Sequence, residues 1–252
     1  MLDKEKIIVE ICAPSVQSAI NADLAGADRI ELCQNLNEGG TTPSFGAIAY
    51  CTEHLGLKTN VLIRPRTGSF CYNEAEFETI KHDVKICKSL GVNGEVVGFL
   101  NPDLTIDVQK TKEIVEIAAP MEVTFHRAFD ICAEWKVALE EIITCGCSRI
   151  LTSGTKPTAL EGKEILNQIV QQANGRIVIL AGSGINYANA EALVNSTGVK
   201  EIHASCTAVV NENEQDVSLE QLLDESNFSH KESNVNLIKK LLSLPLYTNQ
   251  LN

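Results

Sequence analysis

One short pattern recurs along the whole chain: a helix-like run of apolar residues ends at a glycine, and a β-branched apolar stretch follows within two or three residues. The clearest copies begin at Gly26, Gly91, Gly146 and Gly198. Glycine accepts the left-handed conformation in which many helices end, because it has no Cβ atom. Each copy therefore predicts a helix that ends immediately before a strand.

The repeats predict eight strands, each followed by a helix. Strands that alternate with helices pair in parallel through crossover connections. Eight such units in about 250 residues match the (β/α)8 barrel in number and length. The predicted fold class is therefore α/β, a single TIM-like (β/α)8 barrel; the alternative is an open doubly wound sheet, which more often has five or six strands. The predicted strands begin near Ile7, Asp28, Thr59, Gly94, Met121, Arg149, Ile177 and Lys200.

The whole chain, residues 1–252, is predicted to form one domain built on this barrel. After the eighth strand the sequence turns polar over about residues 207–234, with runs rich in Asn, Ser and Glu. We interpret this stretch as a long excursion and not as a second domain. The segment 236–242 is predicted to supply the eighth helix, and the tail after Pro245 is expected to be loose.

Charge and composition limit the partners that the chain can have. Its 252 residues include 33 acidic and 21 basic side chains, a net charge of −12. Such a surface repels phosphate backbones and anionic lipid, so neither nucleic acid nor a membrane is an expected partner. The start of the chain lacks the pattern of a secretory signal, which predicts a cytoplasmic protein. The nine cysteines are then expected to be free thiols.

Alternation along the strands predicts which side chains face the barrel axis. In each of the first two strands, an apolar row suits the surrounding helices. This leaves Glu10 and Cys12 facing inward on the first strand, and Glu31 and Cys33 on the second. The same Glu-apolar-Cys triplet therefore ends both strands inside the barrel.

Three other strands add polar groups to the same end of the barrel. The third aims Arg64 inward and leaves Arg66 at the mouth, the fifth aims His126 inward, and the eighth offers His203. Because barrel proteins carry their chemistry at the carboxyl ends of the strands, these residues predict a polar site there. The alternative is a structural network of ion pairs that fills the top of the barrel.

Six strings of sequence at the predicted strand ends and loops resemble the CutC family, which is named for copper homeostasis. The resemblance runs from about residue 7 to about residue 206. It implies a TIM-like barrel, a cytoplasmic homo-oligomer (dimer or tetramer), and a role in copper handling through Cu(I) binding. The strings are Glu10–Cys12, Gly26–Cys33, Glu38–Ser44, Ile63–Arg66, Thr124–Asp130 and Arg149–Gly154.

The resemblance assigns the family's proposed copper ligands to Cys12 and Cys33. Cu(I) is a soft ion, and two thiolates on neighbouring strands suit it in a reducing cytosol. Adjacent strands lie about 4.8 Å apart, so the two sulfurs can face one ion, with His203 as a candidate third ligand. The alternative is that both are small buried core residues, as free cysteines usually are. Cys145 and Cys147, at a helix end away from this site, are interpreted as structural.

A second hypothesis is an enzyme that acts on a small anionic ligand, either a carboxylate or a phosphate. Arg64 and Arg66 would clamp the anion, while Glu31 or His126 moves a proton as general acid or base. The glycines at 182–184 lie where many barrels bind phosphate through backbone N–H groups. A third hypothesis, a scaffold whose barrel face binds another protein, has less support. The predicted binding residues are Glu10, Arg64, Arg66, Arg127, Asp130 and His203.

Overall fold

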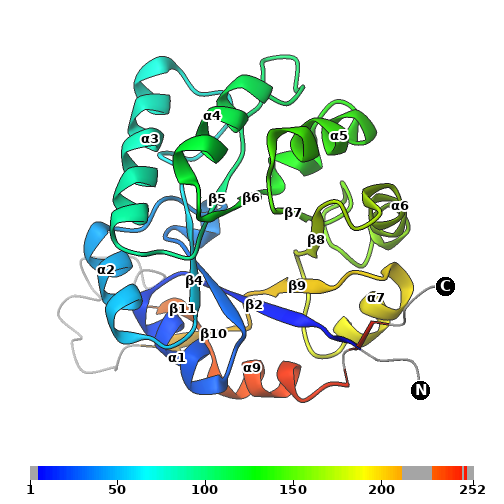
Figure 1. Cartoon of the computed structure of the whole chain (residues 1–252). Helices are drawn as coiled ribbons and strands as arrows, with labels where there is room; N and C mark the ends of the chain where they lie inside the picture. The colour runs from blue at the N-terminus through cyan, green and yellow to red at the C-terminus, as the bar shows by residue number, and fades with distance from the viewer. Residues whose placement is uncertain (1–4, 212–228, 246, 249–252) are drawn as a thin grey trace, which may run out of the picture.

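The computed structural model describes residues 5–211, 229–245 and 247–248 of the chain. Eight parallel strands close into a barrel, and helices surround it (Figure 1). The predicted TIM-like barrel is therefore confirmed, and every barrel strand begins within one residue of its predicted start. The strands are β2 (Ile8–Ala13), β3 (Arg29–Leu32), β4 (Lys58–Leu62), β5 (Gly94–Val97), β6 (Glu122–Phe125), β7 (Arg149–Thr152), β8 (Val178–Ala181) and β9 (Glu201–Ala204).

Each helix of the outer ring has local signals at its ends. Ser15 begins the first helix by accepting a hydrogen bond from the backbone N–H of Ser18. The glycines Gly26, Gly146 and Gly198 end three of the helices with positive φ angles, as the repeat predicts. The helices are α1 (Val16–Ala25), α2 (Phe45–His54), α3 (Glu74–Ser89), α4 (Val108–Ala118), α5 (Trp135–Cys145), α6 (Lys163–Ala173), α7 (Ala190–Thr197) and α9 (Val235–Leu242), with short 3-10 turns η1 (Leu36–Glu38) and η2 (Arg127–Ile131).

Side-chain alternation along the strands divides the core into two parts. Ile7, Val9 and Ile11 belong to the large hydrophobic cluster between the barrel and its helices. Cys12 and Cys33 belong instead to a small separate cluster with Leu62 and Val96. The predicted inward and outward rows of the first two strands are therefore confirmed.

Charged side chains fill the amino-terminal part of the barrel interior. Arg29 donates to Glu10 and to Glu201, at 2.5 Å in each case. Arg149 donates to the same Glu201 oxygen at 2.9 Å and to Glu122 at 2.8 Å. Four of these residues are the first residues of their strands, so the ion-pair network lies at the amino ends of the strands. The alternative predicted from the sequence was a network at the opposite end, at the mouth of the barrel.

The chain beyond the barrel forms a ribbon where a polar excursion is predicted. β10 (Thr207–Asn211) pairs antiparallel with β11 (Ser229–Ser233), and residues 212–228 lie outside the described part. Ser233 attaches the ribbon to the barrel, because its hydroxyl donates to the Cys12 carbonyl at 3.1 Å and its backbone N–H donates to Ser18.

The segment after Pro245 is predicted to be loose, but part of it belongs to a strand pair. β12 (Tyr247–Thr248) pairs antiparallel with β1 (Glu5–Lys6), and this pair lies near the two ends of the drawn chain in Figure 1. The prediction is therefore wrong for Tyr247–Thr248. Residues 246 and 249–252 lie outside the described part of the chain.

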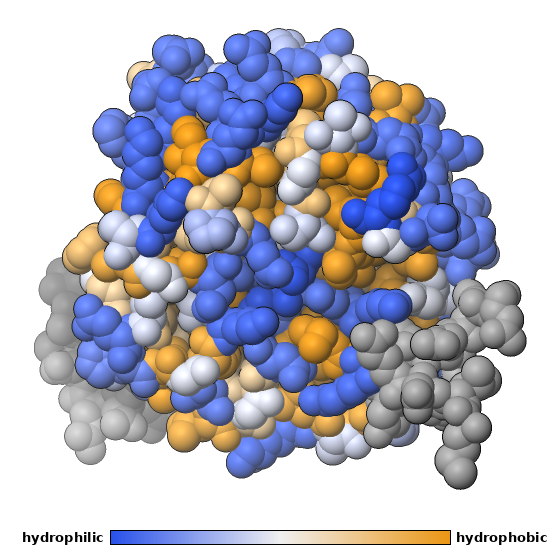
Figure 2. All heavy atoms as spheres, viewed as in Figure 1, coloured by the Kyte–Doolittle hydropathy of each residue, from blue (hydrophilic) through white to orange (hydrophobic). Residues whose placement is uncertain are grey.

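The surface is mixed in character. On the face drawn in Figure 2, hydrophilic residues gather at the centre of the ring, and hydrophobic residues are interspersed among the helices. Within the described ranges, the helices are too short or too polar for any of them to cross a membrane.

Candidate functional site

A cavity of about 340 Å³ lies at the carboxyl-terminal end of the barrel. Its polar lining includes six residues that the sequence predicts for the site, and its remaining wall is largely apolar, with Leu36, Leu62, Phe70, Leu151 and Ile185. Of the other four predicted residues, which do not line this cavity, Cys33 contacts Cys12, while Glu10, Arg66 and Asp130 lie elsewhere. The six lining residues are Cys12, Glu31, Arg64, His126, Arg127 and His203.

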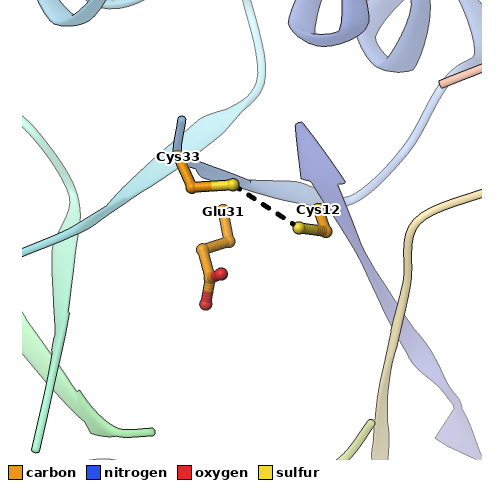
Figure 3. A group of neighbouring side chains, drawn as sticks. All are labelled: Cys12, Glu31 and Cys33. Atoms are coloured by element: carbon orange, nitrogen blue, oxygen red, sulfur yellow. Dashed lines mark hydrogen bonds between the residues drawn. The ribbon is translucent and has the colours of Figure 1, made fainter. Parts of the chain in front are cut away.

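The two predicted thiols face each other across neighbouring strands. The Sγ atoms of Cys12 and Cys33 lie 3.7 Å apart, both residues are buried, and both thiols are free. The Glu31 side chain lies beside them (Figure 3), and its carboxylate and the two sulfurs are all within 4.8 Å of one another. Two thiols and one carboxylate are therefore brought together. Cys145 and Cys147 are buried at the end of α5 and just after it.

The Cys12 thiol holds its proton tightly, because its pKa is raised. The pKa of Cys12 is raised well above its usual value by the hydrogen bond with Cys33, by burial and by the charges of Glu31 and Glu10. Burial also raises the pKa of Glu31 to about 7, because the opposing charges of His203 and Arg29 only partly offset it. Glu31 is therefore the cavity carboxylate that exchanges a proton near neutral pH.

Glu10 lies one layer deeper than predicted and does not line the cavity. Its carboxylate is fully buried, where it accepts from Arg29, from Asn60 at 3.3 Å and from His203 Nδ1 at 2.8 Å. Burial raises the pKa of Glu10, but the His203 hydrogen bond and the Arg29 charge outweigh it and lower the pKa to about 2. Glu10 is thus an ionised structural anchor.

His203 belongs to the carboxylates and not to the thiols. The potential ligand atom of His203 lies within 4.8 Å of those of Glu10 and Glu31. The group that contains the two thiols includes Glu31 but not His203. Burial lowers the pKa of His203, but the Glu31 charge and the Glu10 hydrogen bond raise it above its usual value overall. The expectation of His203 as a third ligand beside the two thiols is therefore not supported by its position.

Arg64 is a buried cation that the backbone holds. It is 5% exposed, and its Nη1 donates to the carbonyls of Glu38 at 3.2 Å and Gly40 at 2.8 Å, while Nη2 donates to Gly68 at 3.0 Å. The guanidinium also lies over the Phe70 ring, 5.0 Å from its centroid. Among the described residues Arg64 has no carboxylate partner, and its Nε has no hydrogen-bond partner.

Arg66 turns away from the cavity, so the predicted clamp of two arginines is wrong. Its Nε pairs with Glu76 at 2.5 Å, and its other nitrogens donate to the carbonyls of Thr67, Ser69 and Cys71 and to Glu76. β4 ends at Leu62, and Arg64 still follows its alternation, whereas Arg66 lies four residues beyond the strand, where the ion pair with Glu76 directs its side chain.

His126 is a buried ring that accepts a hydrogen bond on one of its two nitrogens. Its Nδ1 accepts from the Ala128 backbone N–H at 3.1 Å, so the ring hydrogen of the neutral form is on Nε2. Burial and the nearby Arg64 charge lower the pKa of His126 to about 3, which keeps the ring neutral at pH 7. The ring centroid lies 4.6 Å from that of Phe70, and Nε2 has no partner among the described residues.

Changing Gly98 to alanine is expected to displace the His126 ring. A Cβ atom there would lie 2.2 Å from His126 Cε1 and 2.3 Å from Nδ1, closer than real atoms approach. The hydrogen bond to Ala128 should be lost, which a crystal structure of the variant or the NMR signals of the ring would show. Gly46→Ala is the matched control, because a Cβ at Gly46 meets nothing within 4 Å; an unmoved His126 ring in Gly98→Ala would contradict the prediction.

Arg127 and Asp130 form a structural pair at the rim. Arg127 lines the cavity, but its Nε donates to Asp130 at 2.8 Å and its Nη2 donates to Ser153 at 3.0 Å. Asp130 also accepts from the Thr152 hydroxyl and from the backbone N–H groups of Ser153 and Thr155. The predicted binding residue Asp130 therefore has its carboxylate occupied by the loop after β7.

Sequence reasoning missed two residues that shape this end of the barrel. Phe70, in the loop before α3, contacts both Arg64 and His126, and no periodic pattern marks it. Arg29 is the partner of Glu10, and the inward direction of Glu31 two residues later is a signal that could have found it.

Comparison with known proteins gives consistent matches to one family. The CutC family model matches residues 7–208. A Chromobacterium violaceum protein named family protein CutC is 46% identical over 203 residues, which cover 81% of this chain and 82% of that protein. The human copper homeostasis protein cutC homolog is 42% identical over 198 residues, covering 79% of this chain and 72% of the human one.

Solved structures show the same fold. A Streptococcus agalactiae protein, described as a candidate copper homeostasis protein CutC, superposes with a TM-score of 0.76 at 31% identity, covering 79% of this chain and 98% of that one. An aldolase superposes with a TM-score of 0.60 at 18% identity over 81% of this chain and 92% of that one, a likeness of fold alone.

Proposed function

This chain belongs to the CutC family, and from that premise we propose that it is a copper homeostasis protein that binds Cu(I) through Cys12 and Cys33. A cytoplasmic location and a homo-oligomeric state, dimer or tetramer, are part of the same proposal and follow from the family resemblance alone. The observation that carries the proposal is the pair of buried, free sulfurs 3.7 Å apart.

The donor set fits a soft ion of low coordination number. Cys12 and Cys33 offer two sulfurs, and Glu31 is the third potential ligand beside them within the described residues. A structural zinc site usually has four nitrogen or sulfur ligands, which this group does not provide. Cu(I) prefers thiolates to carboxylates, so the two cysteines alone supply the donors that it favours.

The ion would reach the pair from the cavity. Cys12 lines the cavity, whereas Cys33 does not. The loop that contains Gly40 lies close to Cys33, because a Cβ atom at Gly40 would be 3.7 Å from Cys33 Cβ. Because the Cys12 pKa is raised, an incoming ion must displace protons, and binding should strengthen as pH rises. Glu31 and His203 line the route beside Cys12.

The Cys12→Ser variant is expected to lose Cu(I) binding. Anaerobic titration of the reduced protein, in competition with a chromophoric Cu(I) chelator, should show one ion per wild-type chain. Removal of one of two sulfur donors should weaken the affinity by about 100-fold or more, beyond the 10–100-fold effects of changes in outer-shell partners.

Cys51→Ser is the matched control for this titration. Cys51 is also fully buried, but it lies on α2 in the helix layer, where the hydroxyl replaces a thiol with no ligand role. It should bind Cu(I) like the wild type. Unchanged affinity in Cys12→Ser, or an equal loss in Cys51→Ser, would rule the site out.

A further inference from the structure

We propose that the cavity also binds a small organic molecule by its anionic group, a carboxylate or a phosphate monoester, which docks against Arg64 and His126. This inference does not rest on copper binding. It rests on two residues that line the same cavity, each of which has a buried donor atom without a partner in the described part of the chain.

The first observation is that two buried N–H groups, one on Arg64 and one on His126, have no acceptor. Arg64 and His126 are each 5% exposed, and neither Arg64 Nε nor His126 Nε2 has a partner in the ranges that the structure describes. A buried donor without an acceptor is costly, so native proteins rarely keep one. Both side chains contact Phe70, which places the two donors on one side of the cavity.

The second observation is charge. Arg64 donates to three main-chain carbonyls and has the neutral Tyr72 hydroxyl as a further hydrogen-bonding neighbour, so no carboxylate neutralises the guanidinium charge. Buried arginines are normally paired with an anion. Nε and Nη2 lie on one edge of the guanidinium group, the edge that binds carboxylates and phosphates with two parallel hydrogen bonds.

The third observation is that His126 selects for an acceptor. The Ala128 N–H occupies its Nδ1, so the neutral ring presents an N–H group on Nε2. A cationic ligand would meet Arg64 unfavourably and would offer this N–H no acceptor. An oxyanion satisfies Arg64 and His126 together.

The opposite wall suits the far end of such a molecule. Ser183 and Gly184 follow β8, four strands around the barrel from β4, and both line the cavity. Their φ angles are 80° and 72°, and their backbone N–H groups donate to no acceptor in the described ranges. Loops at this place bind phosphate in many barrels. The cavity of about 340 Å³ is at the small end of ligand pockets, which limits the ligand to a short molecule.

A purely structural role explains only part of this arrangement. The bonds from Arg64 to Glu38, Gly40 and Gly68 hold two loops together without any ligand. They leave Arg64 Nε and His126 Nε2 unused, and these two atoms are the ones that the proposed anion would engage.

The test uses the reduced, metal-free full chain and a set of defined probes. Inorganic phosphate, glycerol 3-phosphate and succinate are added in separate thermal-shift and calorimetric titrations, with glycerol as the uncharged control and potassium chloride at matched ionic strength. Binding to the folded state should raise the melting temperature with at least one anion and not with glycerol or chloride. The phosphate ester and the dicarboxylate show which anionic group is preferred.

Variants then locate the site. Arg64→Met should weaken binding of the effective anion about tenfold or more, as expected for charge-assisted hydrogen bonds. His126→Asn keeps an acceptor for the Ala128 N–H and removes the Nε2 donor, so it should weaken binding about fivefold even if Arg64→Met folds poorly. Arg66→Gln removes a charge two residues away that does not line the cavity, and it should bind like the wild type.

The outcomes separate this proposal from copper binding. No shift with any anion, or an equal loss in Arg66→Gln and His126→Asn, would overturn the anion site. Cys12→Ser should retain anion binding and lose Cu(I), whereas His126→Asn should weaken anion binding and retain Cu(I). A chain that binds an anion but no Cu(I) would therefore contradict only the proposed function.

Discussion

Replacing Arg29 by methionine is expected to lower the free energy of unfolding by about 3–5 kcal/mol, because it leaves buried carboxylates without their cation. Arg29 is 4% exposed and donates to Glu10 and Glu201 at 2.5 Å each. Loss of its charge removes one of the groups that hold the pKa of Glu10 at about 2 against the effect of burial. Urea denaturation at neutral pH measures the change.

An exposed ion pair provides the comparison for Arg29. Arg176 donates to both Glu140 oxygens, at 2.7 and 2.8 Å, but both side chains are 45% exposed. Arg176→Met should lose only a small fraction of what Arg29→Met loses, since water solvates the remaining carboxylate. Equal losses in the two variants would show that the barrel network contributes no more than a surface pair.

Replacing Glu95 by glutamine is expected to stabilise the protein at pH 8 by about 4–5 kcal/mol. Glu95 is fully buried, and neither of its oxygens has a partner among the described residues. Burial raises its pKa to about 8, which the Lys88 charge only partly opposes. The carboxyl is thus protonated in the folded state at pH values where it is ionised in the unfolded chain.

The sign of the pH dependence follows from that difference. Well below pH 4.5 the carboxyl is protonated in both states, so its ionisation does not affect stability, whereas between pH 4.5 and 8 Glu95 alone lowers the stability of the wild-type protein by about 1.4 kcal/mol per pH unit. Glu95→Gln removes this contribution and leaves the smaller one from Glu31, whose pKa is raised in the same direction. Denaturation curves from pH 4.5 to 8 measure it, with the exposed Glu78→Gln as control. A wild-type slope that persists in Glu95→Gln would disprove the assignment.

Sequence reasoning located the barrel well because its signals are local. In the repeated pattern, a helix that ends at Gly26 or Gly146 is followed by a strand within a few residues. The predicted strand starts lie within one residue of those observed. The order of the strands follows, since parallel neighbours require the crossover helices. The ribbon of β10 and β11 escaped prediction because β11 is polar and 17 residues, from 212 to 228, separate the two strands, so no hairpin signal joins them.

Within the site, strand alternation predicted which side chains face the barrel axis, but it did not predict their position along that axis. It correctly turned Cys12 and Cys33 toward each other, yet it put Glu10 at the same level as Cys12. Inward side chains on one strand are about 6.6 Å apart, and this step separates the buried Glu10 from the cavity. For Arg66 alternation fails, because this residue lies four positions beyond the end of β4 and pairs with Glu76. The tautomer of His126 depends on a backbone contact that no spacing rule reveals.

The way Arg64 is held bears on how this chain can vary over evolution. Its acceptors are the main-chain carbonyl oxygens of Glu38, Gly40 and Gly68. Because every amino acid has a main-chain carbonyl, the side chain at position 38 can change without loss of the hydrogen bond to Arg64. Gly40 lacks that freedom, since it has a φ of 86° and a Cβ there would lie 2.6 Å from Leu62. Inherited changes near this loop should therefore accumulate at Glu38 while Arg64 and Gly40 stay fixed as a pair.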